Sequence, residues 1–210
     1  MHSFQFSSVR HLGRRQRGIS LVVTMLMIVV VASLAAAGAR FAISGERSGR
    51  ADRDRELALQ AAETALADAE KDVLGLTGAT RGGDFCKAGT VGFPSSGCAS
   101  STSDRGKCVP AAAGSAPSWI GVDWATAGVP VGTFTGGSFY PTQGTSRSWL
   151  ALAEPRYVIE RIDDRLQDTV DGFADRGEKR QFLYLITAVG YASRSEVKVV
   201  LQSTVRKLTC

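Results

Sequence analysis

The placement of histidine limits the chemistry open to this chain. The 210-residue sequence contains two histidines, His2 and His11, and both lie close to the N-terminus. Histidine is the usual general base, the usual activator of a serine or cysteine nucleophile, and a frequent metal ligand. A domain built from the remaining residues lacks the side chain on which most hydrolases and zinc enzymes depend. We therefore expect no catalytic residues, no metal and no cofactor.

The cysteines are the next residues that could do chemistry, and the sequence has four: Cys86, Cys98, Cys108 and Cys210. No two of them have the short spacing of a zinc-binding pair. An even number of cysteines in an oxidising compartment is typical of disulfides, and four cysteines allow three pairings. Proximity along the chain favours Cys86 with Cys98 and Cys108 with Cys210.

Residues 163–178 form an acidic segment whose carboxylate oxygens could bind Ca²⁺. Its acidic residues are Asp163, Asp164, Asp168, Asp171, Asp175 and Glu178. Their spacing does not match an EF-hand loop, and Arg165 and Arg176 lie among them. We expect a solvated loop between strands, and the sequence leaves open whether it binds calcium.

Two further patterns have an ordinary structural explanation. Ser195 and Lys198 match the Ser-x-x-Lys spacing of some hydrolases. That motif needs the start of a helix, whereas these residues enter an alternating strand, where positions three apart point to opposite faces. The tryptophans, Trp119, Trp124 and Trp149, could stack on sugars or bases. We expect them to pack in the core instead.

An uncharged run, Ile19–Ala39, dominates the N-terminal part of the chain. As a helix, its 21 residues would be about 32 Å long, which matches a hydrocarbon core of about 30 Å. Arg14, Arg15 and Arg17 precede the run, and the positive-inside rule then places the N-terminus in the cytoplasm. The sequence predicts one transmembrane helix, with the rest of the chain on the outer side.

The junction between the basic leader and the apolar run resembles the processing site of type IV prepilins. The sequence at this junction is Arg17-Gly18-Ile19-Ser20-Leu21. In that family a prepilin peptidase cuts after the glycine, on the cytoplasmic side, and methylates the new N-terminus. The resemblance implies cleavage between Gly18 and Ile19, whereas an ordinary signal peptide is cut after its apolar segment. The junction alone leaves a plain signal anchor open as the alternative.

A second resemblance extends the helix beyond the membrane. No proline occurs between Phe41 and Val73. Strong helix formers fill the run Leu57-Ala58-Leu59-Gln60-Ala61-Ala62-Glu63-Thr64-Ala65-Leu66. Apolar residues at spacings of three and four define one helix face, which comprises Leu59, Ala62, Leu66, Ala69 and Val73. The run resembles the segment that follows the membrane helix in PilX-type minor pilins of the type IV pilus.

This resemblance implies an α+β, pilin-like fold. In such a fold a long N-terminal helix, transmembrane in its first half and amphipathic in its second, packs on a small C-terminal antiparallel sheet. The corresponding parts of the chain are a prepilin leader (1–18), a transmembrane helix (19–39), an amphipathic continuation of the helix (40–74) and a periplasmic or extracellular globular domain (75–210).

The C-terminal third can supply the strands of that sheet. Residues 156–162 read as a strand, and residues 182–191 form a nearly continuous apolar run typical of a buried strand. Residues 197–206 alternate apolar and polar side chains, as a half-buried strand does, and a turn at 192–195 precedes them. Before these strands, residues 75–150 are rich in glycine, proline and cysteine, which predicts loops and short elements.

The excess of basic charge is concentrated in the predicted leader. The full sequence carries 25 basic and 20 acidic residues. Removing residues 1–18 takes away four arginines and no acid, which leaves 21 basic residues and a net charge of +1. A nearly neutral mature chain gives no reason to expect nucleic-acid binding.

The family resemblance implies a structural role in the type IV pilus, without catalysis. We expect a minor pilin of the bacterial inner membrane and then of the extracellular fibre. It would prime or support pilus assembly near the tip, and so serve twitching motility and adhesion. The implied partners are other minor pilins, the major pilin, a PilY-type tip adhesin and the prepilin peptidase. The alternatives are a minor pseudopilin of type II secretion and a membrane-anchored extracytoplasmic binding domain.

The fifth residue of the predicted mature chain departs from the pattern of major pilins. They carry a glutamate there, which is held to pair with the N-terminus of the subunit in front, whereas this chain has Val23. A carboxylate inside a bilayer is costly unless it is paired. A subunit without this glutamate lacks one interaction that favours docking behind another subunit. We therefore expect a position near the tip of the fibre.

Overall fold

The part of the chain that the structure describes contains one long helix, a small sheet and, between them, the irregular segment 75–155. The computed structural model describes residues 19–86, 92–112, 114–140, 151–162, 181–194 and 196–208. The element order is α1 (Ile19–Leu74), η1 (Gly82–Cys86), β1 (Lys107–Cys108), η2 (Ser118–Gly121), β2 (Val129–Pro130), β3 (Arg156–Ile162), β4 (Gln181–Tyr191) and β5 (Lys198–Leu208). The chain divides after Gly49 into two compact units, each of which is described by itself.

The first unit contains the N-terminal part of α1, and its apolar surface is exposed. The large apolar side chains involved are Leu21, Val22, Val23, Met25, Leu26, Met27, Ile28, Val29, Val30, Val31, Leu34, Phe41 and Ile43. Within the described ranges, α1 is the one helix that is long and apolar enough to cross a membrane. An apolar surface of this extent needs lipid, or the helices of other subunits, around it.

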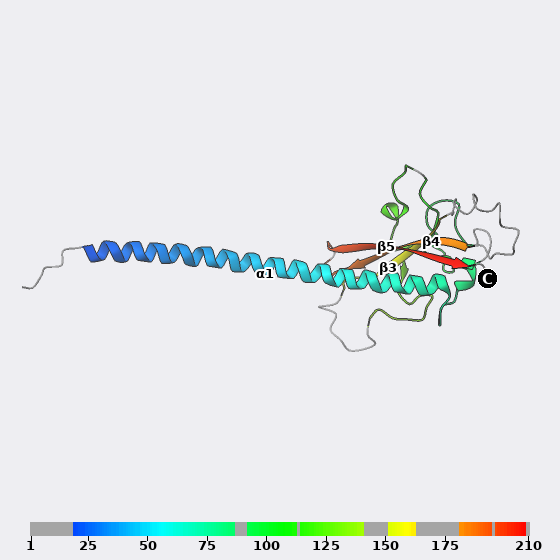
Figure 1. The fold of residues 1–210 in the computed structure, drawn as a ribbon, viewed down its shortest axis with the longest axis horizontal. Coiled ribbons are helices and arrows are strands. Elements are labelled where there is room, and N and C mark those ends of the chain that lie inside the picture. The colour runs from blue at the N-terminus through cyan, green and yellow to red at the C-terminus, as the bar shows by residue number, and fades with distance from the viewer. Residues whose placement is uncertain are drawn as a thin grey trace, which may run out of the picture. The chain divides into compact units, whose positions relative to one another are not determined.

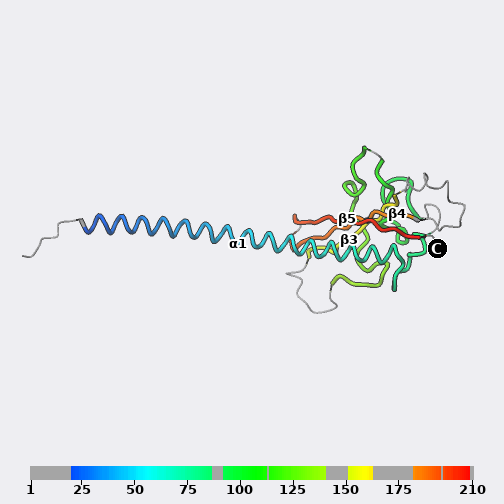
Figure 2. Tube along the Cα trace, in the orientation of Figure 1, coloured from blue at the N-terminus to red at the C-terminus, as the bar shows by residue number. Residues whose placement is uncertain are grey.

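The second unit contains a mixed sheet in the order β1-β3-β4-β5, with β2 also paired to β3. The strands β3, β4 and β5 are antiparallel neighbours, and β2 is antiparallel to β3. The two-residue strand β1 runs parallel to β3. Figures 1 and 2 show β4 and β5 running alongside the C-terminal part of α1.

Small residues allow α1 to lie close against the sheet. The fully buried alanines of this helix are Ala58, Ala61, Ala62, Ala65 and Ala69. Opposite them, β4 carries Gly190, and a Cβ atom at that position would collide with the backbone of Ala58 and Ala62. The pairing of alanine with glycine therefore sets the short distance between helix and strand.

The core of the second unit forms where this alanine face meets β3 and β4. Its larger members include Val73, Phe85, Tyr157, Tyr184 and Ile186. The rings of Phe85 and Tyr184 meet edge to face, with centroids 5.3 Å apart. The Tyr184 hydroxyl donates a hydrogen bond of 2.6 Å to the Phe85 carbonyl, so the buried phenol is satisfied.

The C-terminal end of α1 is closed by a glycine and a lysine. Gly75 adopts a positive φ of 71°, and its N–H donates to the Lys71 carbonyl at 3.0 Å, as at many helix ends. Lys207 of β5 donates from Nζ to the carbonyls of Val73 (2.5 Å) and Gly82 (2.6 Å). The last turn of the helix is thereby attached to the edge strand of the sheet.

The C-terminal strands lie where the sequence predicts them. β3 has the predicted bounds, and β4 and β5 differ from the predicted ranges by one or two residues at their ends. The turn between them is closed by a hydrogen bond of 3.0 Å from Ala192 N to the Val197 carbonyl. The predicted packing of the sheet on the helix is also confirmed, although Leu59 and Leu66 are half-buried and alanines form most of the contact.

The predicted antiparallel pairing of the C-terminal strands is confirmed, and the two-residue strand β1 adds a parallel pair beside β3. One prediction about the middle of the chain is wrong. Trp119 and Trp124 are half-buried and do not belong to the core, and Trp149 lies outside the described residues. The core positions that they were expected to fill are occupied by phenylalanine and tyrosine side chains, such as Phe85 and Tyr184.

Replacing Gly190 with alanine should destabilise the second unit, because the added methyl group must push α1 away from β4. We expect a loss of about 1–3 kcal/mol in the free energy of unfolding, the usual cost of overpacking. Urea unfolding of the full-length protein in detergent measures it. Gly121→Ala is the matched control, since no atom lies within 4 Å of where its Cβ would stand. Equal stability of the two variants would contradict the close approach.

Candidate functional site

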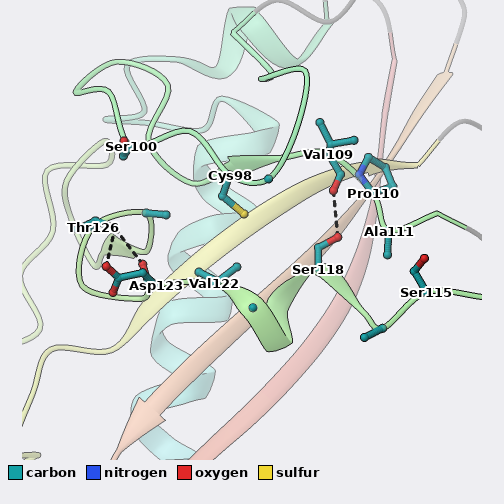
Figure 3. Close-up of a pocket in the computed structure, with 14 residues that line it drawn as sticks. Cys98, Ser100, Val109, Pro110, Ala111, Ser115, Ser118, Val122, Asp123 and Thr126 are labelled. Atoms are coloured by element: carbon teal, nitrogen blue, oxygen red, sulfur yellow. Dashed lines mark hydrogen bonds between the residues drawn. The ribbon is translucent and has the colours of Figure 1, made fainter.

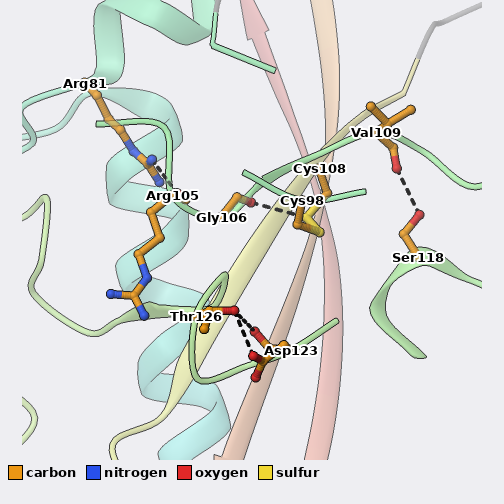
Figure 4. Close-up of a disulfide and its surroundings, with 9 residues drawn as sticks. All are labelled: Arg81, Cys98, Arg105, Gly106, Cys108, Val109, Ser118, Asp123 and Thr126. Atoms are coloured by element: carbon orange, nitrogen blue, oxygen red, sulfur yellow. Dashed lines mark hydrogen bonds between the residues drawn. A yellow bond between two sulfur atoms is a disulfide. The ribbon is translucent and has the colours of Figure 1, made fainter. Parts of the chain in front are cut away.

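A disulfide-closed hairpin, residues 97–109, adds β1 to the sheet. Cys98 and Cys108 are bonded to each other, with their Cα atoms 4.0 Å apart. The N–H of Val109 donates to the Gly97 carbonyl at 2.9 Å. Figure 4 shows the disulfide lying beside β3. The bond therefore holds together the loop that covers this side of the sheet.

The buried side chain of Lys107 stabilises the hairpin through ion pairs. Its side chain is fully buried, with Nζ 2.8 Å from Asp104 Oδ1 and 3.4 Å from Asp84 Oδ2. The rings of Phe85 and Phe93 have their centroids 5.6 and 6.0 Å from the ammonium group. The hydrogen bond from Lys107 is the main cause that lowers the pKa of Asp104, so this carboxylate is ionised at neutral pH. A buried ammonium group is tolerated here because it has carboxylate partners.

A second buried cation joins the hairpin to the helix. Arg81 donates to both carboxylate oxygens of Asp72, with the shortest contact 2.6 Å. The Tyr157 hydroxyl donates to the same carboxylate at 2.9 Å, and burial, followed by the charge of Asp72, raises the pKa of that phenol. Arg81 also donates to the Arg105 carbonyl at 2.7 Å, and its guanidinium lies over the Phe134 ring. The Asp72 carboxylate of α1 is thus linked to β3 through Tyr157 and to the hairpin through Arg81.

A pocket of about 490 Å³ opens between the hairpin and the segment 115–127 (Figure 3). Its walls consist mainly of small apolar and hydroxyl side chains, among them Val109, Pro110 and Val122. The Ser118 hydroxyl donates to the Val109 carbonyl at 3.0 Å and so joins the two walls.

Asp123 supplies the one charged side chain among the residues that line the pocket. Its carboxylate accepts hydrogen bonds from the Thr126 hydroxyl (2.9 Å) and the Ala125 N–H (3.0 Å). The Thr126 bond is the largest of the causes that lower the pKa of Asp123, which is therefore an anion at neutral pH. The lining includes no histidine and no basic side chain. It can hold a small neutral or cationic group.

A buried carboxyl group, Glu160 of β3, lies near the wall of the pocket. It is 4 % exposed, and its Oε1 has no hydrogen-bond partner within the described part of the chain. Burial raises the pKa of Glu160 above its ordinary value, and a hydrogen bond with Ser118 partly opposes this shift. Burial therefore disfavours the ionised form of this carboxyl group.

The structure corrects the predicted disulfide pairing. Cys98 pairs with Cys108, and not Cys86 with Cys98 and Cys108 with Cys210. The hairpin sets Cys98 directly opposite Cys108, and these two are also the closest pair in sequence, with a separation of 10. Cys86 is disulfide-bonded as well, and Cys210 lies outside the described residues.

Other predicted site residues fall partly outside the described chain. Gly18 lies outside it, and Ile19 is the first residue of α1. The acidic segment 163–178 and Ser195 also lie outside it, while Lys198 begins β5. No group of three or more potential metal ligands occurs within the described ranges.

The sequence interpretation missed the buried aspartates of α1. Asp54 and Asp68 are nearly buried and Asp72 fully so. Asp54 accepts a hydrogen bond of 2.7 Å from the Ser193 hydroxyl, and Asp68 accepts one of 2.8 Å from the Gly132 N–H. A usable signal was present, because these acids occur three or four residues from buried alanines. An acid on the buried face of a helix implies a partner elsewhere in the fold.

Replacing Glu160 with glutamine should flatten the pH dependence of stability. The folded-state pKa lies above the ordinary value of 4.5, so the folded chain holds the proton more tightly than the unfolded chain. The resulting stabilisation is complete below the ordinary pKa of 4.5, and it is lost as the pH rises through the folded-state pKa. The melting temperature of Glu160→Gln, measured relative to that of the wild type, should therefore be higher near neutral pH than at pH 4.

Thermal unfolding of the full-length protein between pH 4 and pH 8 measures the difference. The exposed Glu154→Gln is the matched control, and its stability should follow the wild-type curve. A Glu160→Gln curve parallel to that of the wild type over the whole range would show that this carboxyl group is not responsible.

Two family models together match most of the chain. Residues 85–207 match the model described as type IV pilus assembly protein PilX, C-terminal, and residues 17–67 match the model described as PilX, N-terminal. Neither a curated protein nor a solved structure matches the chain. The N-terminal match includes the whole junction at Arg17, and the C-terminal match includes the hairpin, the pocket and the sheet.

Proposed function

The chain belongs to the PilX family of type IV pilus assembly proteins, and from this premise we propose that it is a minor pilin that primes or supports fibre assembly near the tip. Through this role it serves twitching motility and adhesion. The observation that carries the proposal is that the two parts of α1 have different surroundings. Its first part presents exposed apolar side chains, and its second part supplies the alanine face of a folded domain. A subunit of this kind can leave a bilayer only when other helices cover the apolar part.

The proposal includes a maturation pathway. The chain is inserted in the bacterial inner membrane with its N-terminus in the cytoplasm, and the prepilin peptidase removes residues 1–18. The mature chain then has a membrane-spanning segment (19–39), a continuation of the helix (40–74) and an outer domain (75–210). The apolar, helical start of the mature chain at Ile19 supports this division.

Its partners in this scheme are other minor pilins, the major pilin and a PilY-type tip adhesin. Small residues such as Ala32, Ser33, Ala36 and Gly38 allow neighbouring helices to approach closely in the membrane. The outer domain presents the hairpin and pocket to further partners. Family membership favours this role over that of a type II secretion pseudopilin. Because the second unit contains a pocket, a membrane-anchored binding domain is the second candidate.

Complementation of a deletion strain tests the proposal. Loss of this chain should abolish or strongly reduce surface fibres in cells whose prepilin peptidase and assembly ATPase are intact. Wild-type protein should restore the fibres and have methylated Ile19 at its N-terminus, as read by mass spectrometry. Gly18→Val should keep the leader and fail to restore fibres, because the peptidase cannot cut after a bulky residue. Gly13→Val, a leader change away from the junction, is the matched control.

Two outcomes would overturn the proposal. A normal number of fibres in the deletion strain would remove the role in assembly and favour the binding domain. A mature chain that still begins at Met1, or one cut near Ala37, would remove prepilin processing.

A single substitution tests the tip position. Val23→Glu restores the carboxylate that major pilins carry at the fifth mature residue, so the subunit can dock behind another. We expect the variant to be found along the fibre, whereas the wild type is found at its end, as seen by immunogold labelling. Val22→Glu is the control, since it places a similar charge on a different face of the helix. An unchanged position of the Val23→Glu subunit would contradict the tip argument.

A further inference from the structure

The strand β5 forms one edge of the sheet, and it is unusually long for an edge strand. It has eleven residues and pairs with β4 along its whole length, in a register without a bulge. In the strand order it is terminal, and no other described strand pairs with it. Every second residue of such a strand directs its N–H and C=O outward, where they can bind another chain.

The usual devices that protect an edge strand are missing from its middle. Residues 199–205 contain no proline and no charged side chain. Natural sheets commonly blunt exposed edges with proline, bulges, inward charges or short strands. An edge of this kind is a ready template for one more strand.

The side chains beside this edge are only partly covered. Val199 and Leu201 of β5 are half-buried. On α1, Glu70 accepts a hydrogen bond of 3.0 Å from Ser203, so this side of the helix faces β5. Leu66 lies one turn before Glu70 on the same side of the helix and is also half-buried. An added strand with apolar side chains toward the helix would bury these residues further.

The charge of β5 indicates what kind of strand fits. Its charged residues are Lys198, Arg206 and Lys207, all of them basic and all at its ends. Lys198 and Arg206 are exposed. Pairing β5 with a second copy of itself, parallel in register or antiparallel with Lys198 opposite Arg206, sets basic residues against basic residues, which is unfavourable. A strand with acidic residues at both ends suits this edge.

We propose that the outer edge of β5 binds an extended segment of a different protein, added to the sheet as a further strand. The segment alternates apolar and polar residues, presents its apolar side chains toward α1, and carries acidic residues at both ends. Backbone hydrogen bonds supply most of the affinity, and the terminal charges select the partner. This interaction does not depend on the tip position.

A charge-swap experiment with synthetic peptides tests this. The acidic probe has valine alternating with threonine between glutamates at both ends, and the basic probe is identical except for lysines at the ends. Full-length protein in detergent should bind the acidic peptide about tenfold more tightly than the basic peptide, by fluorescence anisotropy, since two exposed charge pairs differ in sign. The double variant Lys198→Glu/Arg206→Glu should reverse this preference. Arg53→Glu/Arg55→Glu, with two exposed residues of α1 changed, should keep it.

Hydrogen exchange locates the peptide. Binding of the acidic peptide should slow amide exchange in β5 and leave β3 unchanged. Three results would overturn the proposal: no binding of either peptide, a preference that survives the charge swap at β5, or protection confined to elements other than β5. Dimerisation of the protein through β5 would also overturn it, because the edge would then accept a second copy.

Discussion

The carboxylate of Asp72 is the interaction on which the second unit depends. It is fully buried, and it is bound at once by the guanidinium of Arg81 and the hydroxyl of Tyr157. Through these two partners the last turns of α1, the start of the irregular segment and the central strand β3 are tied to one point. Burying a single charge would be strongly unfavourable, whereas a paired and hydrogen-bonded charge can be accommodated. The residues at the start of the segment between α1 and β3, around Arg81, are therefore held in place although they contain little regular structure.

The hairpin at residues 97–109 is held by the same kind of contact. Lys107 is buried between two aspartates, Asp104 and Asp84, and the Cys98–Cys108 disulfide closes the hairpin around it. Apolar packing alone would specify this region poorly, because glycine and alanine offer little area to bury. Buried polar partners and a covalent bond supply the missing specificity. The pocket is open for the same reason, since its walls are set by backbone and hydroxyl groups and are not filled by large side chains.

Regular elements could be predicted from the sequence because their signals are periodic. The helix follows from a proline-free run up to Gly75, which is apolar in its first part and rich in strong helix formers in its second, and β3, β4 and β5 follow from their apolar and alternating patterns. The two-residue strands β1 and β2 could not be predicted, because they exist only through pairing with β3. Tryptophans were expected in the core on grounds of size, and the irregular segment keeps Trp119 and Trp124 half-buried. The Cys98–Cys108 pairing could not be predicted, because no local sequence pattern indicates the hairpin that brings these two residues together.

The second half of α1 is at once a continuation of the predicted membrane segment and a wall of the core. From Asp54 to Val73, one face of this helix is buried, and it includes Ala58 and Ala62 beside β4. A protease that cuts the chain between Ala58 and Val73 would therefore separate part of this face from the domain that it covers. Proteolytic release within this stretch would therefore expose the core and favour further degradation.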